Sequence, residues 1–315
     1  MNTAVLFDAP GPKTRRRIVL MNIIGGVAVL GLLVVVFIAL EDRGQLTAAK
    51  WRPFIGADVW RYYLLPGLIA TITAAALSMV LANVFGLIFG VGRLSSNRVI
   101  RFLSGVVVEF FRAVPVLVMM IFFYFLYSRS GVIHPADAPF WAVVTGLTLY
   151  NGSVIAELIR SGVVNLPSGQ SEAGLSIGLS QRQTLSSILL PQALIAMMPS
   201  MVSQLVVILK DTALGYLITY SELLRQSRLV GTAYQNLLPA LMVVAVVFIA
   251  INFALSRLAD RLALKLTSRT SIEIADLDPA DEGRAPMLGS IHTGPIDPST
   301  VHHRPHPTTT ARELP

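Results

Sequence analysis

Six long stretches of the sequence carry no charged residue, and this feature limits the possible folds more than any other. They cover residues 18–40, 62–92, 113–128, 138–156, 183–209 and 229–256. A helix needs about 20 apolar residues to cross a bilayer, and five of the six stretches come within a residue of that length or exceed it. Charged residues make up 14% of the chain, whereas soluble domains hold about 25%. We therefore expect an all-α integral membrane protein with six membrane helices.

The stretch at 113–128 is shorter than a bilayer crossing requires. Further apolar residues precede it, on the other side of Glu109 and Arg112. We therefore predict a membrane helix here that carries these two charged residues.

The basic residues predict which ends of the helices face the cytoplasm. Thirteen flank one side: Lys13, Arg15, Arg16, Arg17, Arg93, Arg98, Arg101, Arg160, Arg182, Arg257, Arg261, Lys265 and Arg269. Seven flank the other: Arg43, Lys50, Arg52, Arg61, Arg129, Arg225 and Arg228. Cytoplasmic loops carry an excess of Lys and Arg, so we expect a plasma-membrane protein with both termini in the cytoplasm. The net charge of +7 is then a sign of topology, and no nucleic-acid partner is expected.

These patterns divide the chain into five parts. We expect a basic cytoplasmic tail at 1–17, an additional membrane helix at 18–40, an external loop at 41–61, a five-helix core at 62–258 with a cytoplasmic loop at 163–190, and a cytoplasmic tail at 259–315. The last part is rich in proline and acidic residues and cannot bury enough apolar surface to fold, so we predict that it is largely disordered.

Several kinds of chemistry have no motif in this sequence. There is no cysteine, no G-x-x-x-x-G-K-[ST] phosphate loop, no H-E-x-x-H and no G-x-S-x-G. We therefore expect no enzyme activity, no metal site and no cofactor bound by this chain.

The loop between the fourth and fifth stretches is the most informative segment. Pro167 and Ser168 are a helix-start signal, Gly174 and Gly178 are spaced to leave one helical face bare, and Pro191 suits the first turn of the next helix. Such a helix could rest on the bilayer surface or dock into a groove of a soluble partner. A surface helix has a strongly basic polar face. Because this segment carries few charges, its composition favours docking.

Residues in this loop resemble the EAA motif of ABC-importer permeases. The matching residues are Glu172, Ala173, Gly174, Gly178, Ile188, Leu190 and Pro191, with Gly174 in place of the third alanine. FRAVPVL at 111–117, YNGSVIAELIRSGV at 150–163 and LKDTALGYL at 209–217 are similar to segments of the polar amino-acid subfamily. The resemblance covers residues 62–257, and the whole sequence is most similar to actinobacterial glutamate-uptake permeases.

This resemblance implies a type I importer that moves a polar amino acid, with glutamate as the expected substrate. The implied partners are a separate ATPase that holds ATP and Mg, a second permease that forms a heterodimer with this chain, and an external lipid-anchored solute-binding protein. A coupling helix at 173–181 would dock into the ATPase. The residues assigned to this coupling are Glu172, Ala173, Gly174, Leu175, Gly178, Leu179 and Pro191.

Charged residues inside the apolar stretches each need an explanation, because they are costly in hydrocarbon. Glu109 with Arg112, and Glu157 with Arg160, are three residues apart and can neutralise each other. Lys210 and Asp211 are adjacent and cannot pair well, so they either anchor the helix at the interface or line a polar path. We take as candidates for the substrate path Glu157, Arg160, Lys210, Asp211 and Thr212.

Two glycines predict close helix packing. Gly86 and Gly90 form a G-x-x-x-G motif, which can face another helix of this chain or a second permease.

Two other functions remain open at this point. A secondary transporter driven by an ion gradient would need internal inverted repeats, and we find none. A membrane anchor without transport activity would use the 163–190 loop only as a docking site.

Overall fold

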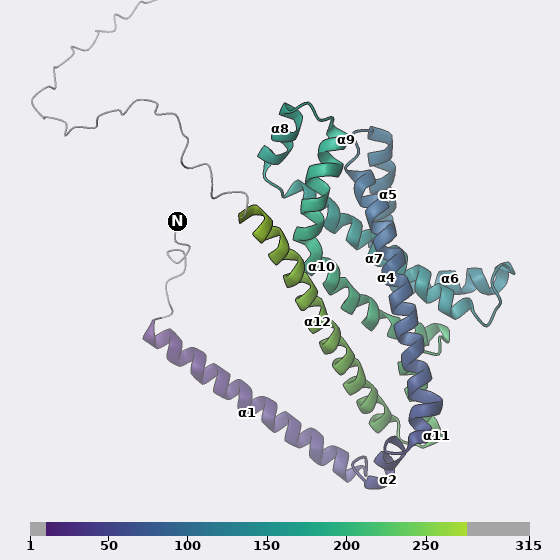
Figure 1. Cartoon of the computed structure of the whole chain (residues 1–315). Helices are drawn as coiled ribbons and strands as arrows, with labels where there is room; N and C mark the ends of the chain where they lie inside the picture. Colours follow the sequence, from purple (N-terminus) through teal and green to yellow (C-terminus); the bar gives the residue numbers. More distant parts are fainter. Residues whose placement is uncertain (1–10, 276–315) are drawn as a thin grey trace, which may run out of the picture. The chain divides into compact units, whose positions relative to one another are not determined.

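The computed structural model describes residues 11–275, and every regular element in that range is helical (Figure 1). The longer helices are α1 (Pro12–Asp42), α4 (Leu65–Arg93), α5 (Arg98–Ala113), α6 (Val116–Ser130), α7 (Ala138–Val164), α10 (Leu190–Asp211), α11 (Leu223–Ala233) and α12 (Leu237–Ala275). The shorter ones are α2 (Ala48–Trp51), η2 (Arg52–Phe54), α3 (Ala57–Val59), η3 (Trp60–Leu64), α8 (Ser168–Ser176), α9 (Gln181–Thr184), η4 (Leu185–Leu189) and η5 (Thr212–Ile218).

The chain separates into two units, Met1–Ser268 and Arg269–Pro315, and the first contains the helices that position the site. Residues 1–10 of the predicted basic tail and 276–315 of the predicted disordered tail lie outside the described residues. The start of the predicted C-terminal tail is helical, because α12 continues through Ala275.

Five helical segments are long and apolar enough to cross a membrane: 13–42, 57–93, 138–164, 181–218 and 237–257. The third predicted span differs from our expectation, because it consists of α5 and α6, which meet at an angle of 98°. Its chain bends where Val114 takes an extended conformation, with φ −82° and ψ 127°. A residue before proline is disfavoured in the α conformation, and Pro115 therefore ends α5. The count is six spans only if this bent pair forms one.

Helix α7 lies at the centre of the bundle and contacts α4, α6 and α10. Its contact with α4 depends on glycine. A Cβ atom added to Gly86 would lie 2.5 Å from Ile155 Cγ2, and one added to Gly152 would lie 2.8 Å from Phe85 Cδ1. Gly90 lies against Ala156 in the same way. The G-x-x-x-G motif thus faces another helix of this chain, which is the close approach that small residues permit in membranes.

The segment after α1 is folded into short helices rather than forming an irregular loop. The indole N–H of Trp51 donates to the Gln45 carbonyl at 3.1 Å, and that of Trp60 donates to the Phe54 carbonyl at 2.8 Å. Phe54 and Val59 are buried in a cluster with Leu223 of α11. These contacts join the segment to the bundle.

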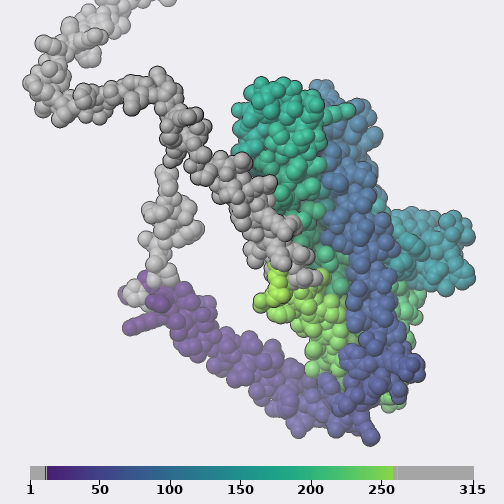
Figure 2. Space-filling model, in the orientation of Figure 1, coloured from purple at the N-terminus to yellow at the C-terminus, as the bar shows by residue number. Residues whose placement is uncertain are grey.

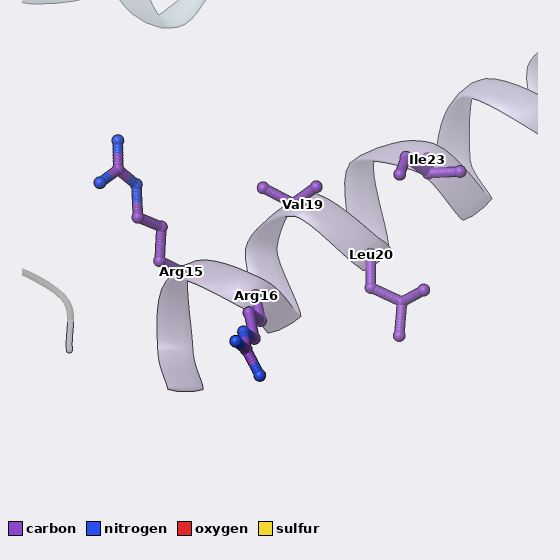
Figure 3. A pocket seen from close by; sticks show the side chains of 5 residues that line it. All are labelled: Arg15, Arg16, Val19, Leu20 and Ile23. Atoms are coloured by element: carbon purple, nitrogen blue, oxygen red, sulfur yellow. The ribbon is translucent and has the colours of Figure 1, made fainter. Parts of the chain in front are cut away.

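Helix α1 has a different environment, because none of the residues in its most apolar window is buried. Among the described residues, the hollow in Figure 3 is lined by five residues of this helix: Arg15, Arg16, Val19, Leu20 and Ile23. Two arginines followed by an apolar surface are what a helix presents where it enters a bilayer.

The loop 165–181 and the turn between α4 and α5 lie at one end of the bundle, and α2 and α11 lie at the other (Figure 1). In the space-filling view the loop and the turn form one continuous surface (Figure 2). The side chains agree, since Ser96 Oγ donates to Gln181 Oε1 at 2.8 Å.

Candidate functional site

Helix α8 begins at Ser168, directly after Pro167. It ends in a Schellman motif, in which Gly178 N–H donates to the Leu175 carbonyl at 3.0 Å and Leu179 N–H donates to the Gly174 carbonyl at 3.1 Å. Gly178 has a φ of +86°, a conformation that glycine adopts without strain. The helix therefore covers 168–176, and the prediction of a helix at 173–181 is wrong because Gly178 terminates it.

The predicted glycine face is present only at Gly174, because Gly178 lies beyond the end of the helix. Gly174 is buried, and a Cβ atom there would lie 2.8 Å from Thr184 Cγ2 and 3.1 Å from Ile188 Cδ1. It packs α8 against α9 and η4 of the same chain. Within the loop 165–181, the exposed large apolar side chains are Leu175, 45% exposed, and Ile177, 76% exposed.

Ile177 is a candidate contact that sequence reasoning missed. It precedes the glycine that ends the helix, and an apolar residue in that position was a usable signal. Glu172 and Ala173 are exposed beside it. The surface available for docking is thus Glu172, Ala173, Leu175 and Ile177, while Leu179 is partly covered.

The loop is tied to the next membrane helix at three points. Ser180 and Gln183 form a capping box at the start of α9, which stabilises that turn. Gln192 Nε2 donates to Gln170 Oε1 at 3.3 Å, which links α10 to α8. Gly174 supplies the third contact. Side chains in contact therefore join α8 to the start of α10.

Pro191 lies in the first turn of α10, as predicted, but α10 is not a separate helix. Helix α9, η4, α10 and η5 form one continuous helical segment, 181–218. Turn η4 is a π turn in which Leu190 N–H donates to the Leu185 carbonyl. Proline removes one N–H and clashes with the carbonyl four residues earlier, so a wider turn before it lets the helix continue.

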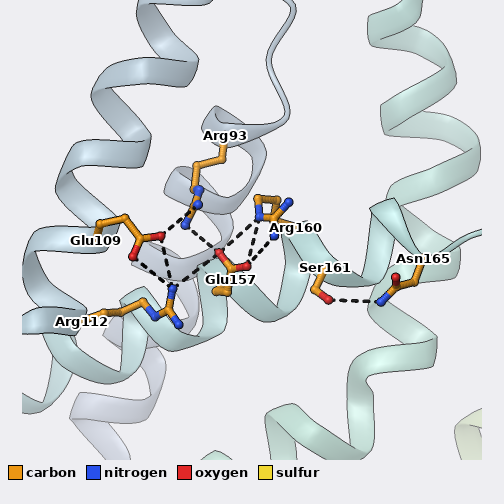
Figure 4. A network of polar contacts seen from close by, with 7 residues as sticks. All are labelled: Arg93, Glu109, Arg112, Glu157, Arg160, Ser161 and Asn165. Carbon is orange, nitrogen blue, oxygen red and sulfur yellow. Dashed lines mark hydrogen bonds and ion pairs between the residues drawn. The ribbon is translucent and has the colours of Figure 1, made fainter.

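Five charged side chains from three helices form one network (Figure 4). The two pairs spaced by three residues form, with Arg160 Nη2 2.6 Å from Glu157 Oε1 and Arg112 Nη1 3.3 Å from Glu109 Oε1. Arg93 joins them, at 2.7 Å from Glu157 and 3.1 Å from Glu109. The network connects the end of α4 to α5 and α7, and its three guanidinium groups and two carboxylates leave one net positive charge.

The role of Arg93 was missed from the sequence. We counted it among the residues that mark the cytoplasmic side, and its distance along the chain from Glu109 and Glu157 gave no signal of contact. Its side chain is 15% exposed, against 23% for Glu157 and 59% for Glu109.

Helix α10 ends at Asp211, where the chain tightens into the 3-10 turn η5. Lys210 is exposed and lines a hollow of about 380 Å³ with Leu241, Val244, Phe248 and Asn252. Asp211 is half-buried, and Thr212 is buried with its hydroxyl donating to the Leu209 carbonyl at 2.6 Å. Within residues 11–275, no ion pair links these residues to Glu157 or Arg160. The predicted path residues thus form two separate groups.

A comparison with protein families identifies the class of protein. Residues 82–268, more than half of the chain, match the family described as binding-protein-dependent transport system inner membrane component. The chain belongs to this family. It is a multi-pass inner-membrane permease subunit, and ATP hydrolysis in such systems belongs to a separate ATPase.

Named relatives of this permease are transport proteins as well. The glutamate transport system permease protein GluD of Corynebacterium glutamicum is 48% identical over 227 residues, covering 72% of this chain and 83% of the relative. The probable glutamine ABC transporter permease protein GlnP of Bacillus subtilis is 35% identical, covering 68% of this chain and 99% of the relative.

Solved structures give the permease the same fold. A chain from the crystal structure of an amino acid ABC transporter with histidines matches with a TM-score of 0.59 and 24% identity, covering 64% of this chain and 93% of that one. A chain of the MetNI methionine ABC transporter in an inward-facing conformation matches with a TM-score of 0.57 and 18% identity, covering 66% and 98%. The type I importer permease fold expected from the sequence is confirmed.

Proposed function

We propose that this permease takes up glutamate, or a closely related polar amino acid, with energy from a partner ATPase. The main support is the relative named for glutamate transport, which is 48% identical over 83% of its own length. A further relative, from Escherichia coli, is named as a glutamate/aspartate import permease and is 27% identical over 205 residues.

The ATPase docks on α8. Its exposed face offers Glu172, Ala173, Leu175 and Ile177, and Gly178 fixes where the helix ends. Gly174 and Leu179 hold the helix against the chain that leads to Pro191 and α10. Closure of the ATPase dimer then moves α8 and the start of α10 together.

The substrate passes between the charge network and the end of α10. Glu157 and Arg160 belong to a network with one net positive charge, which suits a substrate with one net negative charge such as glutamate. Lys210 and Asp211 offer an ammonium and a carboxylate group at the end of α10, and Thr212, whose buried hydroxyl donates to the Leu209 carbonyl, holds the turn behind them. Together they can orient both the amino and the carboxylate groups of an amino acid.

The assembly contains four kinds of partner. The ATPase holds ATP and Mg, a second and different permease completes the path, and a lipid-anchored solute-binding protein delivers the amino acid from outside. Both termini of this chain and its coupling loop, 163–190, face the cytoplasm, and the helix at 18–40 is an addition to the core at 62–258. The excess of basic residues on that side supports this orientation.

A reconstituted importer tests the proposal. The complex, with its binding protein in liposomes, should hydrolyse ATP faster when glutamate is added, and less so with glutamine or histidine. Glu172→Lys should abolish uptake, whereas Lys50→Glu, a charge reversal at the predicted external end, should not.

Three results would contradict it. Uptake by the lone purified chain under an ion gradient would indicate a secondary transporter. Normal uptake in a deletion strain would indicate a membrane anchor. Equal stimulation by every amino acid would remove the claim for glutamate.

A further inference from the structure

Glu222 carries a fully buried carboxyl group at the junction between η5 and α11. Its Oε2 accepts from Leu224 N–H at 2.7 Å, and its Oε1 accepts from Arg225 N–H at 2.6 Å. These bonds cap α11. Among residues 11–275, no cation forms an ion pair with Glu222. A buried carboxyl group without a partner of opposite charge is costly, and the established parts of the site do not use it.

The turn that Glu222 caps lies directly on the start of α4. Leu223 N–H donates to Thr71 Oγ1 at 3.1 Å, and the Tyr220 hydroxyl donates to the Ala70 carbonyl at 2.7 Å. A Cβ atom on Gly67 would lie 3.0 Å from Leu223 Cα, so the two backbones approach as closely as glycine allows. The junction therefore fixes α11 to α4.

The same junction determines where α10 ends. Tyr220 N–H donates to the Gly215 carbonyl at 3.0 Å, which closes the η5 turn after Asp211. Between them Thr219 has a φ of +65°, a conformation that a β-branched residue rarely adopts. Strain of this kind persists only where the surroundings hold it, and here the bonds of Tyr220 and Glu222 do so.

We propose that Glu222 is a positioning residue for transport. Its carboxyl group caps the turn whose Leu223 N–H and Tyr220 hydroxyl bond the start of α4, and this turn fixes the end of α10 with Lys210, Asp211 and Thr212. This proposal rests on the proposed function, because it takes those three residues as part of the substrate path. It extends that function by making uptake depend on a proton at this junction.

Burial allows Glu222 to change protonation near neutral pH. Burial raises its pKa to about 7, against the two N–H bonds and Arg225, which favour the ionised form. Burial and the charge of Glu222 also raise the pKa of Tyr220. The parts of α4 in contact here, Gly67, Ala70 and Thr71, carry no charge. The remaining ionisable side chains of the packed elements are Arg52 in η2, Asp58 in α3, Tyr216 in η5, and Arg61, Tyr62 and Tyr63 in η3. Arg61 lies over the Tyr62 ring, and Arg228 of α11 lies over the Tyr216 ring.

The experiment compares Glu222→Gln, Glu222→Asp and Glu222→Ala in the complete importer with its binding protein. Glutamate uptake and ATP hydrolysis are measured in liposomes as the outside pH changes. The matched control is Asp58→Asn, which removes an exposed carboxylate from α3. Loss of a helix cap corresponds to about a fivefold change in an equilibrium, so we expect Glu222→Ala to raise KM about fivefold or more. Glu222→Gln should flatten the change in uptake between about pH 6 and about pH 8, because it removes the titrating group.

Each outcome bears on the proposal. If Glu222→Gln keeps the KM and the pH profile of the control, the proposal is overturned. If the Gln and Ala variants do not assemble, the test is the pH profile of Glu222→Asp. This variant keeps both acceptor oxygens and the negative charge but has a shorter side chain. A shifted midpoint of its pH profile supports the proposal, and an unchanged midpoint overturns it. Failure of the proposed function would be recognised separately, because the unmodified importer would then show no glutamate-stimulated uptake.

Discussion

Helices α1 and α7 are both long enough to cross a bilayer, yet they have opposite surroundings. The apolar window of α1 has a mean hydropathy of 3.0 and no buried residue, whereas that of α7 has a mean hydropathy of 1.4 and is 61% buried. In lipid the solvent is as apolar as leucine, so burial follows from small and polar side chains rather than from hydrophobicity. The less hydrophobic helix is therefore the one at the centre.

The buried residues of α7 show what replaces hydrophobicity. Gly146 and Gly152 let Met120 and Phe85 approach within 3 Å of the positions that a Cβ atom would occupy. Asn151 and Ser153 have no exposed surface. Helix α1 also contains glycines, Gly25, Gly26 and Gly31, but nothing lies within 4 Å of them. Glycine alone does not make a packing surface, and it needs a partner of matching shape.

The largest effect should come from filling the contact between α4 and α7. Gly86→Leu places its Cβ atom 2.5 Å from Ile155 Cγ2, and overpacking of this kind costs about 3 kcal/mol. Gly26→Leu in α1 has open space and serves as the control. We expect thermal unfolding of the purified permease in detergent to shift strongly for the first variant only. Equal shifts would mean that α1 is packed as tightly as α7.

The next effect should come from the charge network. Glu157→Gln removes the carboxylate shared by Arg93, Arg112 and Arg160, and we expect a loss of about 2 kcal/mol because part of the network is open to screening. Glu109→Gln is the matched control, with a side chain 59% exposed. The free energy of unfolding, measured in denaturant, should decrease more for Glu157 than for Glu109. The reverse order would place the centre of the network on α5.

The stability of the helix bundle should depend on pH through Glu222, whereas α1 should contribute no such dependence. The pKa of Glu222 is raised from 4.5 to about 7, so the folded chain binds a proton more tightly than the unfolded chain does. This contribution to stability is complete below about pH 4.5 and is lost as the pH rises through about 7. The unfolding temperature should therefore decrease by a few degrees over that range, and Glu222→Gln should remove the decrease. A decrease that persists in the Gln variant would assign it to another group.

The smallest effect should follow removal of α1. A chain that begins at residue 43 loses a helix with no buried residue in its apolar window, so the unfolding temperature of the bundle should change by less than the error of the measurement. Insertion into the membrane must be checked separately, by protease protection of the remaining loops. A clear destabilisation would show that α1 packs against the bundle.

Much of the fold was predictable, because long uncharged stretches leave few alternatives to membrane helices. The bend between α5 and α6 was also present in the sequence, since Pro115 disfavours a helical Val114, but apolar residues on both sides suggested one span. The pairs of Glu109 with Arg112 and Glu157 with Arg160 follow from helical spacing. The link through Arg93 does not, because it depends on how α4, α5 and α7 pack.

The loop 163–190 also contains features that depend on packing and cannot be predicted from the sequence. Pro167 correctly marked the start of α8. Gly178 could serve either inside a helix or at its end, and spacing alone favoured the wrong choice. Gly174 faced its own chain because Thr184 and Ile188 lie opposite, which only the folded turn reveals.

The two π turns determine which faces of the following helices meet their neighbours, and sequence comparison can detect a change in either turn. One, η3, precedes Pro66, and the other, η4, precedes Pro191, and both prolines follow two leucines. A π turn holds one more residue than a regular turn needs, and each residue rotates a helix by about 100°. A relative that replaces either proline while losing one residue from the preceding turn would keep the same faces in contact. A relative that makes only one of these two changes, the proline replacement or the loss of a residue, would rotate the rest of that helix so that its side chains contact a different neighbouring helix.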